Sequence, residues 1–458
     1  MALAATPRVP DEPLRVLRAL WQSGHAAYLV GGGIRDELLG RIPTDWDVAT
    51  DARPERLLQL FPEGRYENRF GTVTINKVET TTFRRDHVYG DHRRPDSVTF
   101  TDDFGEDLRR RDFTVNAIGW GRPGDADSAP QPDWVDPTGG IADLRAGTLR
   151  AVGEPAKRFD EDSLRLLRAA RLAAQLGFEI EPATKTAMVE SAHLVGWLSS
   201  ERVGGEMRRM IATDPPSTAF RILADTNLLA GVLPELWAQR GVAQDKIEGH
   251  DLLDHSLATL DAAAVLESFD LTLRLAALLH DIGKPATQAD GRFIGHDEVG
   301  ARQGAELLAR LAFPAHQVER VRRLIHHHMF SYQANWTDAA LRRFVRRVGR
   351  DLVDELLRLR QADNLGSGWP ADAGALDELR RRLAAELAAG PPLTLAELAV
   401  NGDDLQAELA IKPGPWIGGL LDRLLDSVVT DPSRNSRTLL LADARSWLAD
   451  FLPAPPDR

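Results

Sequence analysis

Hydrophobic and polar positions divide the chain into two parts with different periodicities. Between residue 26 and about residue 120, short apolar or alternating runs bounded by turn residues predict β-strands. The expected strands are residues 26–30, 47–50, 72–75, 78–83 and 97–100. Three glycines at 31–33 follow the first run, and we expect a helix from Ile34 to Leu39 that Gly40 ends. This order of strand, glycine turn, helix and further strands predicts a small α/β unit.

From about Arg158 onward, apolar residues recur at helical spacing almost to the end of the chain. Residues 121–140 are rich in turn formers and predict a loop, while proline breaks at 214–216 and 390–392 suggest boundaries between helical domains. We therefore predict an α+β protein in which an α/β head precedes helical domains. The expected domains are a head at 1–150, a helical neck at 151–215, a helical body at 216–385 and a helical tail at 386–458.

Composition narrows the classes of protein. The 458 residues include no cysteine, which excludes disulfides and thiolate metal sites, so any metal must bind His, Asp or Glu. We find no apolar run of about 18 residues and no signal-peptide pattern, so we expect a soluble, cytoplasmic protein with no membrane partner. A net charge of −12 argues against non-specific coating of nucleic acid.

Positive charge is nevertheless concentrated locally. Residues 320–350 contain eight arginines and one acid, Asp338, and so carry +7. Arg342, Arg343, Arg346 and Arg347 recur at helical spacing and predict a basic face for RNA phosphates. A merely solvated face is the alternative.

Two carboxylates follow the glycine turn. Asp45 and Asp47 are two residues apart in a strand-like segment, which places both side chains on one face. Carboxylates of this kind are ligands for Mg²⁺, and the glycines with Arg35 would admit a phosphate. A lone Asp-x-Asp is most often a loop or cap, but beside the glycine turn the pair predicts phosphoryl or nucleotidyl transfer.

At this point the chain resembles the class II tRNA nucleotidyltransferase and bacterial poly(A) polymerase family. The motifs that carry the resemblance are LVGGGIRD at 29–36 with DWD at 45–47, VETTTFR at 78–84 with DHRRP at 91–95, EDLRRRDFTVNA at 106–117, and EDSLRLLRAAR at 161–171. The resemblance implies a nucleotidyltransferase head of the polymerase β type and addition of CCA, or part of it, to tRNA from CTP and ATP. A hairpin at 75–77 that is shorter than usual in the family leaves CC-only and A-only addition open. Poly(A) synthesis is a further alternative, against which the histidine-rich middle of the chain argues.

The resemblance also assigns roles to residues. Asp45 and Asp47 would be catalytic and hold Mg²⁺. The triphosphate would be oriented by Gly32, Arg35, Arg111, Arg168 and Arg171. Asp162 and Arg165, three apart on an expected helix, would select the base. A carboxylate accepts from the amine that C and A present beside a ring acceptor, where G and U present a carbonyl. A surface ion pair is the alternative.

Eight of the twelve histidines lie within residues 250–328. The ordered set His255, His280, Asp281 and Asp363 resembles the HD superfamily of metal-dependent phosphohydrolases, which is all-helical, so the helical body is expected to be an HD domain with its own divalent metal. The three histidines at 326–328 cannot all face one site, and at most two would be ligands. This predicts, as an alternative function of another class, hydrolysis of phosphate esters at RNA ends. The oligomeric state stays open.

Overall fold

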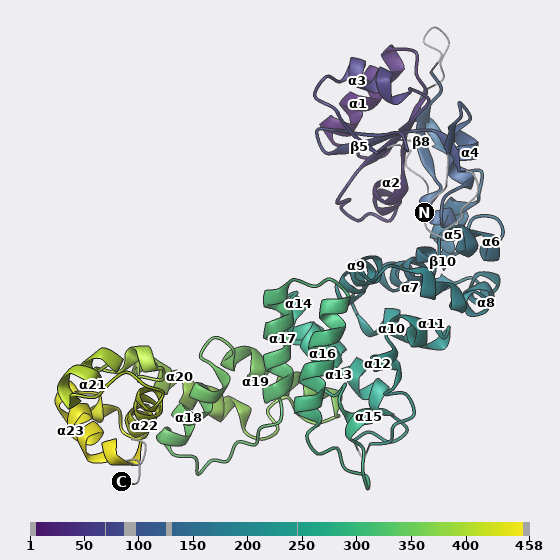
Figure 1. Cartoon of the computed structure of the whole chain (residues 1–458). Helices are drawn as coiled ribbons and strands as arrows, with labels where there is room; N and C mark the ends of the chain where they lie inside the picture. The colour runs from purple at the N-terminus through teal and green to yellow at the C-terminus, as the bar shows by residue number, and fades with distance from the viewer. Residues whose placement is uncertain (1–5, 69, 87–97, 125–130, 245, 452–458) are drawn as a thin grey trace, which may run out of the picture. The chain divides into compact units, whose positions relative to one another are not determined.

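The computed structural model describes residues 6–68, 70–86, 98–124, 131–244 and 246–451 (Figure 1). The motif at 91–95 and the first residue of the last expected strand lie outside these residues. Two compact units form: Met1–Ala238 with Arg310–Ala312, and Gln239–Ala309 with Phe313–Arg458. The four-domain division stays a prediction. Among the described helices, none combines the length and the apolar character that crossing a bilayer requires.

A seven-stranded sheet forms the centre of the head, with strand order β3-β4-β5-β2-β1-β8-β9. The strands are β1 Ala27–Val30, β2 Asp47–Thr50, β3 Arg65–Asn68, β4 Thr72–Ile75, β5 Val78–Thr82, β8 Gly119–Arg122 and β9 Asp133–Val135. Neighbours are antiparallel except β2 and β5, which run parallel with Asp47 opposite Glu79. Strands β6 Arg84–Asp86 and β7 Val98–Phe100 form a separate antiparallel pair.

Helices cover both faces of this sheet. On one face, α1 (Asp11–Gln22) and α3 (Pro54–Leu60) bury Val16, Leu20 and Leu57 against the strands (Figure 1). On the other face lies α4 (Phe104–Arg109), whose Phe104 ring stacks on Tyr28 with centroids 3.9 Å apart. Apolar burial on both faces holds the ends of β1 and β2 in fixed positions.

Two local predictions for the head were wrong. Helix α2 spans Gly31–Leu38 and so begins at the first glycine, which makes the glycines the first helical turn and not a loop before it. The expected loop at 121–140 contains the end of β8 and all of β9, because Trp134 of β9 pairs with Trp120 of β8 and packs on the core. A strand that forms through such pairing cannot be recognised from the sequence of a turn-rich segment alone.

The rest of the described chain is almost entirely helical, which confirms the predicted α+β class. The first unit continues with α5 Gly140–Ala146, α6 Pro155–Glu161, α7 Leu164–Leu176, α8 Pro182–Glu190, α9 Ser200–Ile211, α10 Ser217–Asp225, α11 Leu228–Val232 and α12 Pro234–Trp237, and contains a short parallel pair, β10 Thr148–Leu149 and β11 Glu179–Ile180. The second unit contains α13 Leu252–Leu266, α14 Leu271–Leu279, α15 Lys284–Thr287, α16 His296–Arg310, α17 Ala315–His327, α18 Asp338–Val348, α19 Val353–Gly366, α20 Leu376–Ala388, α21 Gly402–Leu409, α22 Trp416–Thr430 and α23 Arg437–Trp447.

Candidate functional site

The acidic pair of the head lies where β2 begins, against the first turn of α2. Asp47 is the first residue of β2, and Asp45 precedes it as an exposed residue. The chain approaches α2 so closely here that a Cβ on Gly33 would lie 2.4 Å from the Asp45 carbonyl oxygen. A Cβ on Gly31, whose φ is +79°, would lie 2.8 Å from Asp47 Oδ2. Glycine is therefore required at both positions for the carboxylates to lie beside the helix N-terminus.

A third carboxylate, which the sequence motifs did not single out, belongs to this group. Glu79 of β5 lies opposite Asp47 across the parallel pair and is exposed. Burial raises the pKa of Asp47 from 3.8 to about 6; Arg111 opposes this, and the charges of Asp45 and Glu79 add to it. Three neighbouring carboxylates, two of them exposed, fit a hard divalent cation such as Mg²⁺.

The raised pKa of Asp47 predicts a pH-dependent gain in stability for Asp47→Asn without added metal. Ionised Asp47 destabilises the fold above pH 6, so the variant should exceed wild type in unfolding free energy by up to about 3 kcal/mol at pH 8. The gain should fall to roughly half at pH 5 and vanish below the unfolded pKa of 3.8, because wild type then carries the proton in both states. Urea unfolding in EDTA at these pH values measures it; an equal gain at every pH would contradict it.

The predicted triphosphate ligands of the head are held by other side chains. Arg35 is buried; its guanidinium pairs with Asp36 at 2.7 Å and donates to Asn116 Oδ1 at 2.7 Å. Gly32 lies beside that guanidinium: a Cβ there would be in ordinary contact with Arg35 Nη2, at 3.5 Å. Arg111 pairs with the buried Asp107 at 3.2 Å, and its Nε is buried without a hydrogen-bond partner among the described residues. Of these residues, Arg111 is the one whose charge acts on Asp47.

The helical placement of Asp162 was wrong. Asp162 is the C-cap of α6 and precedes α7, so Asp162 and Arg165 do not share a helix face. The carboxylate of Asp162 accepts from Arg202 at 2.9 and 3.0 Å and from the Leu164 N–H at 3.1 Å. The Arg165 guanidinium contacts Glu161 Oε2 at 2.8 Å and two backbone carbonyls. Capping by Asp162 ends one helix and starts the next, which competes with a continuous helix.

The two remaining arginines of this motif lie on α7 and bind different acids. Arg168 pairs with the buried Asp112 at 2.6 Å, and Arg171 pairs with the buried Glu206 at 2.5 Å. The Arg168 side chain stays one-third exposed, while that of Arg171 is buried. These pairs connect α7 to the motif at 106–117 and to α9, within the first unit.

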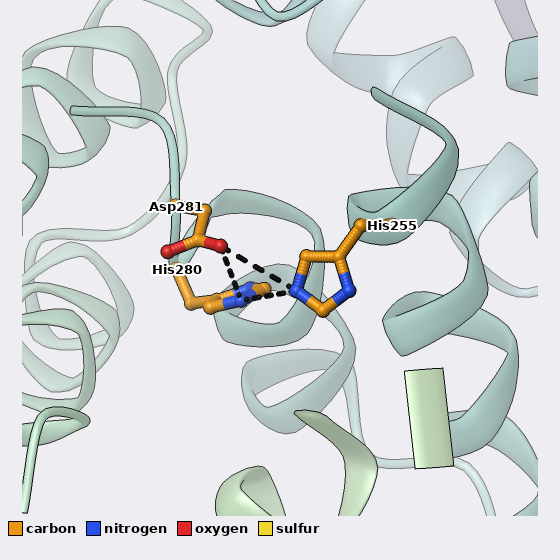
Figure 2. Close-up of side chains that lie close together, drawn as sticks. All are labelled: His255, His280 and Asp281. Atoms are coloured by element: carbon orange, nitrogen blue, oxygen red, sulfur yellow. Dashed lines mark hydrogen bonds and ion pairs between the residues drawn. The ribbon is translucent and has the colours of Figure 1, made fainter. Parts of the chain in front are cut away.

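In the second unit, the four predicted HD residues come together. The imidazoles of His255 and His280 and the carboxylate of Asp281 point toward one another (Figure 2). The two imidazole Nε2 atoms are 3.1 Å apart, and Asp281 Oδ2 lies 3.4 Å from that of His255 and 3.2 Å from that of His280. Asp363 Oδ1 is 3.2 Å from His255 Nε2. The helices α13, α14 and α19 position these groups, because their apolar faces pack together.

A second ligand group shares Asp281 with the first. Asp281 Oδ1 lies 3.3 Å from His296 Nε2 and 3.7 Å from His328 Nε2, and the two imidazole nitrogens are 3.2 Å apart. His328 could have been found from the sequence, because it continues the buried face of α17 that Val321, Leu324 and Ile325 form. His326, in contrast, is exposed.

Both groups fit divalent metals. Each comprises three buried ligands whose atoms lie within 4.8 Å of one another. Burial lowers the pKa of His280 to about 4, so this imidazole is neutral at pH 7 and able to bind a metal. Burial alone would raise the pKa of Asp281, but His280 and hydrogen bonds from neighbouring histidines hold it well below its usual value. Asp281 is therefore an ionised carboxylate with one oxygen directed at each group.

The predicted basic face is largely neutralised. Arg342 is buried and donates to the carbonyl oxygens of Val429 and Thr430, where it caps the end of α22. Arg346 pairs with Asp422 and Asp426. Arg343 and Arg347 are exposed. The prediction was therefore wrong for Arg342, whose guanidinium faces protein carbonyls and not solvent.

Comparisons with known proteins agree along the chain. Family models match residues 27–150 (poly A polymerase head domain), 177–240 (probable RNA and SrmB-binding site of polymerase A) and 252–367 (HD domain). A CCA-adding enzyme of Geobacillus thermodenitrificans is 33% identical over 96% of both chains, and one of Levilactobacillus brevis is 32% identical over 96% of this chain and 99% of the relative.

Solved structures give the same result. The Bacillus stearothermophilus CCA-adding enzyme in complex with CTP is 28% identical, with a TM-score of 0.71 over 96% of this chain and 98% of its own. The Thermotoga maritima CCA-adding enzyme complexed with tRNA is 17% identical, with a TM-score of 0.58 over 96% of this chain and 97% of its own, a likeness of fold.

Proposed function

Since this chain belongs to the family of CCA-adding enzymes, we propose that it adds C and A nucleotides to the 3′ end of tRNA, using CTP and ATP and releasing pyrophosphate. The observation that carries the proposal is 33% sequence identity over nearly the full length of a relative named for this activity, together with Asp45, Asp47 and Glu79 where the central strands β2 and β5 begin. CC-only addition, A-only addition and poly(A) synthesis remain the alternatives.

In this proposal the acids of the head hold Mg²⁺ through Asp45 and Asp47. Mg²⁺ there would assist the attacking 3′-hydroxyl and neutralise charge on the leaving pyrophosphate. The N-terminal turn of α2, including Gly32, presents backbone N–H groups to the triphosphate. Arg111 lies close enough to Asp47 to lower its pKa and would contact the same phosphates. Arg35, Arg168 and Arg171 would act on the triphosphate either directly or by holding Asp36, Asp112 and Glu206 in place.

We propose that Asp162 and Arg165 select the incoming base. The backbone N–H of Arg165 donates to the Asp162 carbonyl at 2.9 Å, so the two residues stay adjacent although their side chains bind Arg202 and Glu161. A base that offers an amine beside an acceptor nitrogen would replace these partners with equivalent hydrogen bonds. G and U would leave the Asp162 carboxylate facing a carbonyl, which is unfavourable in a partly buried site.

The test uses tRNA ending at the discriminator base, at C or at CC, with each NTP alone. We expect CTP to be added to the first two substrates and ATP to the third, with GTP and UTP at least about 100-fold slower. Asp162→Ala should reduce this discrimination at least about 10-fold, because the acceptor for the base amine is lost. Gel analysis of extended tRNA measures each rate.

The matched control is Asp160→Ala, which removes an exposed acid from α6 two residues earlier and should keep wild-type discrimination. If GTP and UTP were used as readily as CTP by the wild type, the base-selection proposal would be wrong. If only ATP were added, to any end, the poly(A) alternative would replace CCA addition.

A second activity is favoured by the two ligand groups around Asp281. We propose that the HD domain hydrolyses phosphate esters with divalent metals bound by His255, His280, Asp281 and Asp363 and by His296 and His328. Metals there would activate water and neutralise phosphate charge.

The proposed contacts to tRNA phosphates are Arg343 and Arg347, the exposed members of the predicted basic face. Arg346 would have to exchange its acidic partners for RNA phosphates, and Arg342 would support α22.

A further inference from the structure

A cavity of about 590 Å³ opens beside the two ligand groups that share Asp281, and it is much larger than a metal site requires. Its lining includes metal ligands of both groups, four basic side chains and several large apolar side chains. They include Lys246, Lys284, Arg360, Ile294, Met329 and Trp369. The side chains that line the cavity therefore indicate the chemical class of its ligand.

The inner part of the cavity is positively charged and fits a phosphate. The Lys284 ammonium lies 2.6 Å from Asp281 Oδ2 and over the ring of Phe293, which fixes it beside the shared carboxylate. Lys246 lies 3.1 Å from Asp363 Oδ1 and 2.9 Å from His255 Nε2. Arg360 donates to the backbone carbonyl of Phe330 while lining the same cavity. These cations surround the place where an anion would meet the metal ligands.

The outer part is apolar and exposed. Ile294, Met329 and Trp369 all line the cavity, and they are 80%, 58% and 52% exposed. Large apolar side chains gathered at the mouth of a charged cavity are typical of a binding site. They give the mouth of the cavity an apolar surface beside its charged interior.

Trp369 is held rigidly at this mouth. Its backbone N–H donates at 2.8 Å to the carbonyl of Asn364, the residue that follows Asp363. Gly368 adopts a φ of +76°, and the Asn364 amide donates to the carbonyls of Ala371 and Ala373. The indole is therefore presented on an ordered turn while half of its surface stays exposed, as a stacking platform would be.

We propose that this cavity takes a phosphate ester that carries a nucleobase, and that Trp369 is the specificity-determining residue on which the base stacks. The inference rests on the HD hydrolase proposed above and adds the residue that recognises the base of its substrate. Phosphate binds among Lys246, Lys284 and the metal ligands, and the base reaches outward to Trp369 with Met329 beside it. A free nucleotide and a phosphorylated RNA end share this chemistry.

The test measures binding and turnover separately with the full-length protein. Calorimetry with Mg²⁺ or Mn²⁺ compares 3′-AMP, a 3′-phosphorylated oligonucleotide, and glycerol 2-phosphate, which has no base. Wild type should bind the two base-bearing esters roughly 5- to 100-fold more tightly than glycerol 2-phosphate, since base stacking on an aromatic side chain contributes that much. In Trp369→Ala this preference should disappear, and in Trp369→Phe most of it should remain.

Hydrolysis should show the same pattern in KM: the preference for base-bearing esters should be lost in Trp369→Ala and mostly kept in Trp369→Phe. The matched control is Phe269→Ala, because Phe269 is 55% exposed in the same unit and lies outside the cavity lining; it should behave as wild type. Tighter binding of the oligonucleotide than of 3′-AMP would identify an RNA end as the ligand. Equal affinity for esters with and without a base, or an unchanged preference in Trp369→Ala, would overturn the inference. Base-dependent binding without hydrolysis of any ester would overturn the hydrolase proposal alone.

Discussion

Asp47→Asn is expected to reduce nucleotide addition to tRNA at least about 1000-fold, the scale of several kcal/mol that a metal supplies to phosphoryl transfer. The amide keeps the shape of the side chain but removes the charge that Mg²⁺ needs. Because Asp47 is the first residue of β2 and lies between α2 and Glu79, a neighbouring acid cannot replace it without moving the strand. The rate of CMP incorporation into tRNA that lacks CCA, at saturating Mg²⁺, measures the loss.

The stability of the same variant shows whether its loss of activity comes from loss of folding. Asp47→Asn should unfold at higher urea than wild type above pH 6, since it removes a charge whose burial is unfavourable. Asp51→Asn is the control, because Asp51 lies just beyond the other end of β2 and pairs with His25. It should retain activity within about two-fold, the range for a surface substitution away from the site. If nucleotide addition survives in Asp47→Asn, the assignment of the transferase site to the head is wrong.

The acidic pair was predictable because its geometry is local. Asp45 and Asp47 are two residues apart where β2 begins, so they are close together whether or not Asp45 belongs to the strand. Glu79 was not predictable in this way. It joins the pair only because β5 lies parallel to β2 with Glu79 opposite Asp47, and the register between two strands 31 residues apart depends on the whole sheet.

The HD ligands show the same limit at longer range. His280 and Asp281 are adjacent in sequence, whereas His255 and Asp363 reach them through the packing of α13, α14 and α19. Helical periodicity identifies which residues of α17 are buried and so favours His328 over His326, but it does not say what they face. That His296 and His328 meet the second oxygen of Asp281 follows only from the tertiary structure.

Charge patterns were the least reliable guide. The arginines of 320–350 suggested a basic face, yet acids that lie outside this segment pair with several of them, such as Glu355 with Arg320 and Glu386 with Arg342. Asp162 and Arg165 likewise are bound by residues of other elements or of the preceding helix. Long charged side chains find partners across helix faces, and these partners are set by packing and not by spacing along the chain.

Asp281→Asn is expected to remove both metal ions from the HD domain and to lower metal affinity at least about 100-fold, more than the loss of a supporting group around a metal site. Asp281 directs one carboxylate oxygen at each ligand group, so one substitution affects both. His255→Ala and His328→Ala each remove a ligand of one group only, and each should therefore leave one tightly bound ion per chain. Metal content after dialysis, measured by mass spectrometry, distinguishes these outcomes, and His316→Ala is the control because it removes an exposed histidine of α17 outside the cluster.

The same variant separates the two proposed activities. Asp281 lies in the second compact unit, whereas Asp45 and Asp47 lie in the first, so Asp281→Asn should abolish ester hydrolysis and leave nucleotide addition within about two-fold. Circular dichroism should show wild-type helix content, because Lys284 and the histidines can still donate to the amide oxygen at position 281. One bound ion per chain in Asp281→Asn would show that the two groups do not share this carboxylate. Loss of nucleotide addition with normal helix content would mean that the HD metals serve the transferase, and that the chain has one activity and not two.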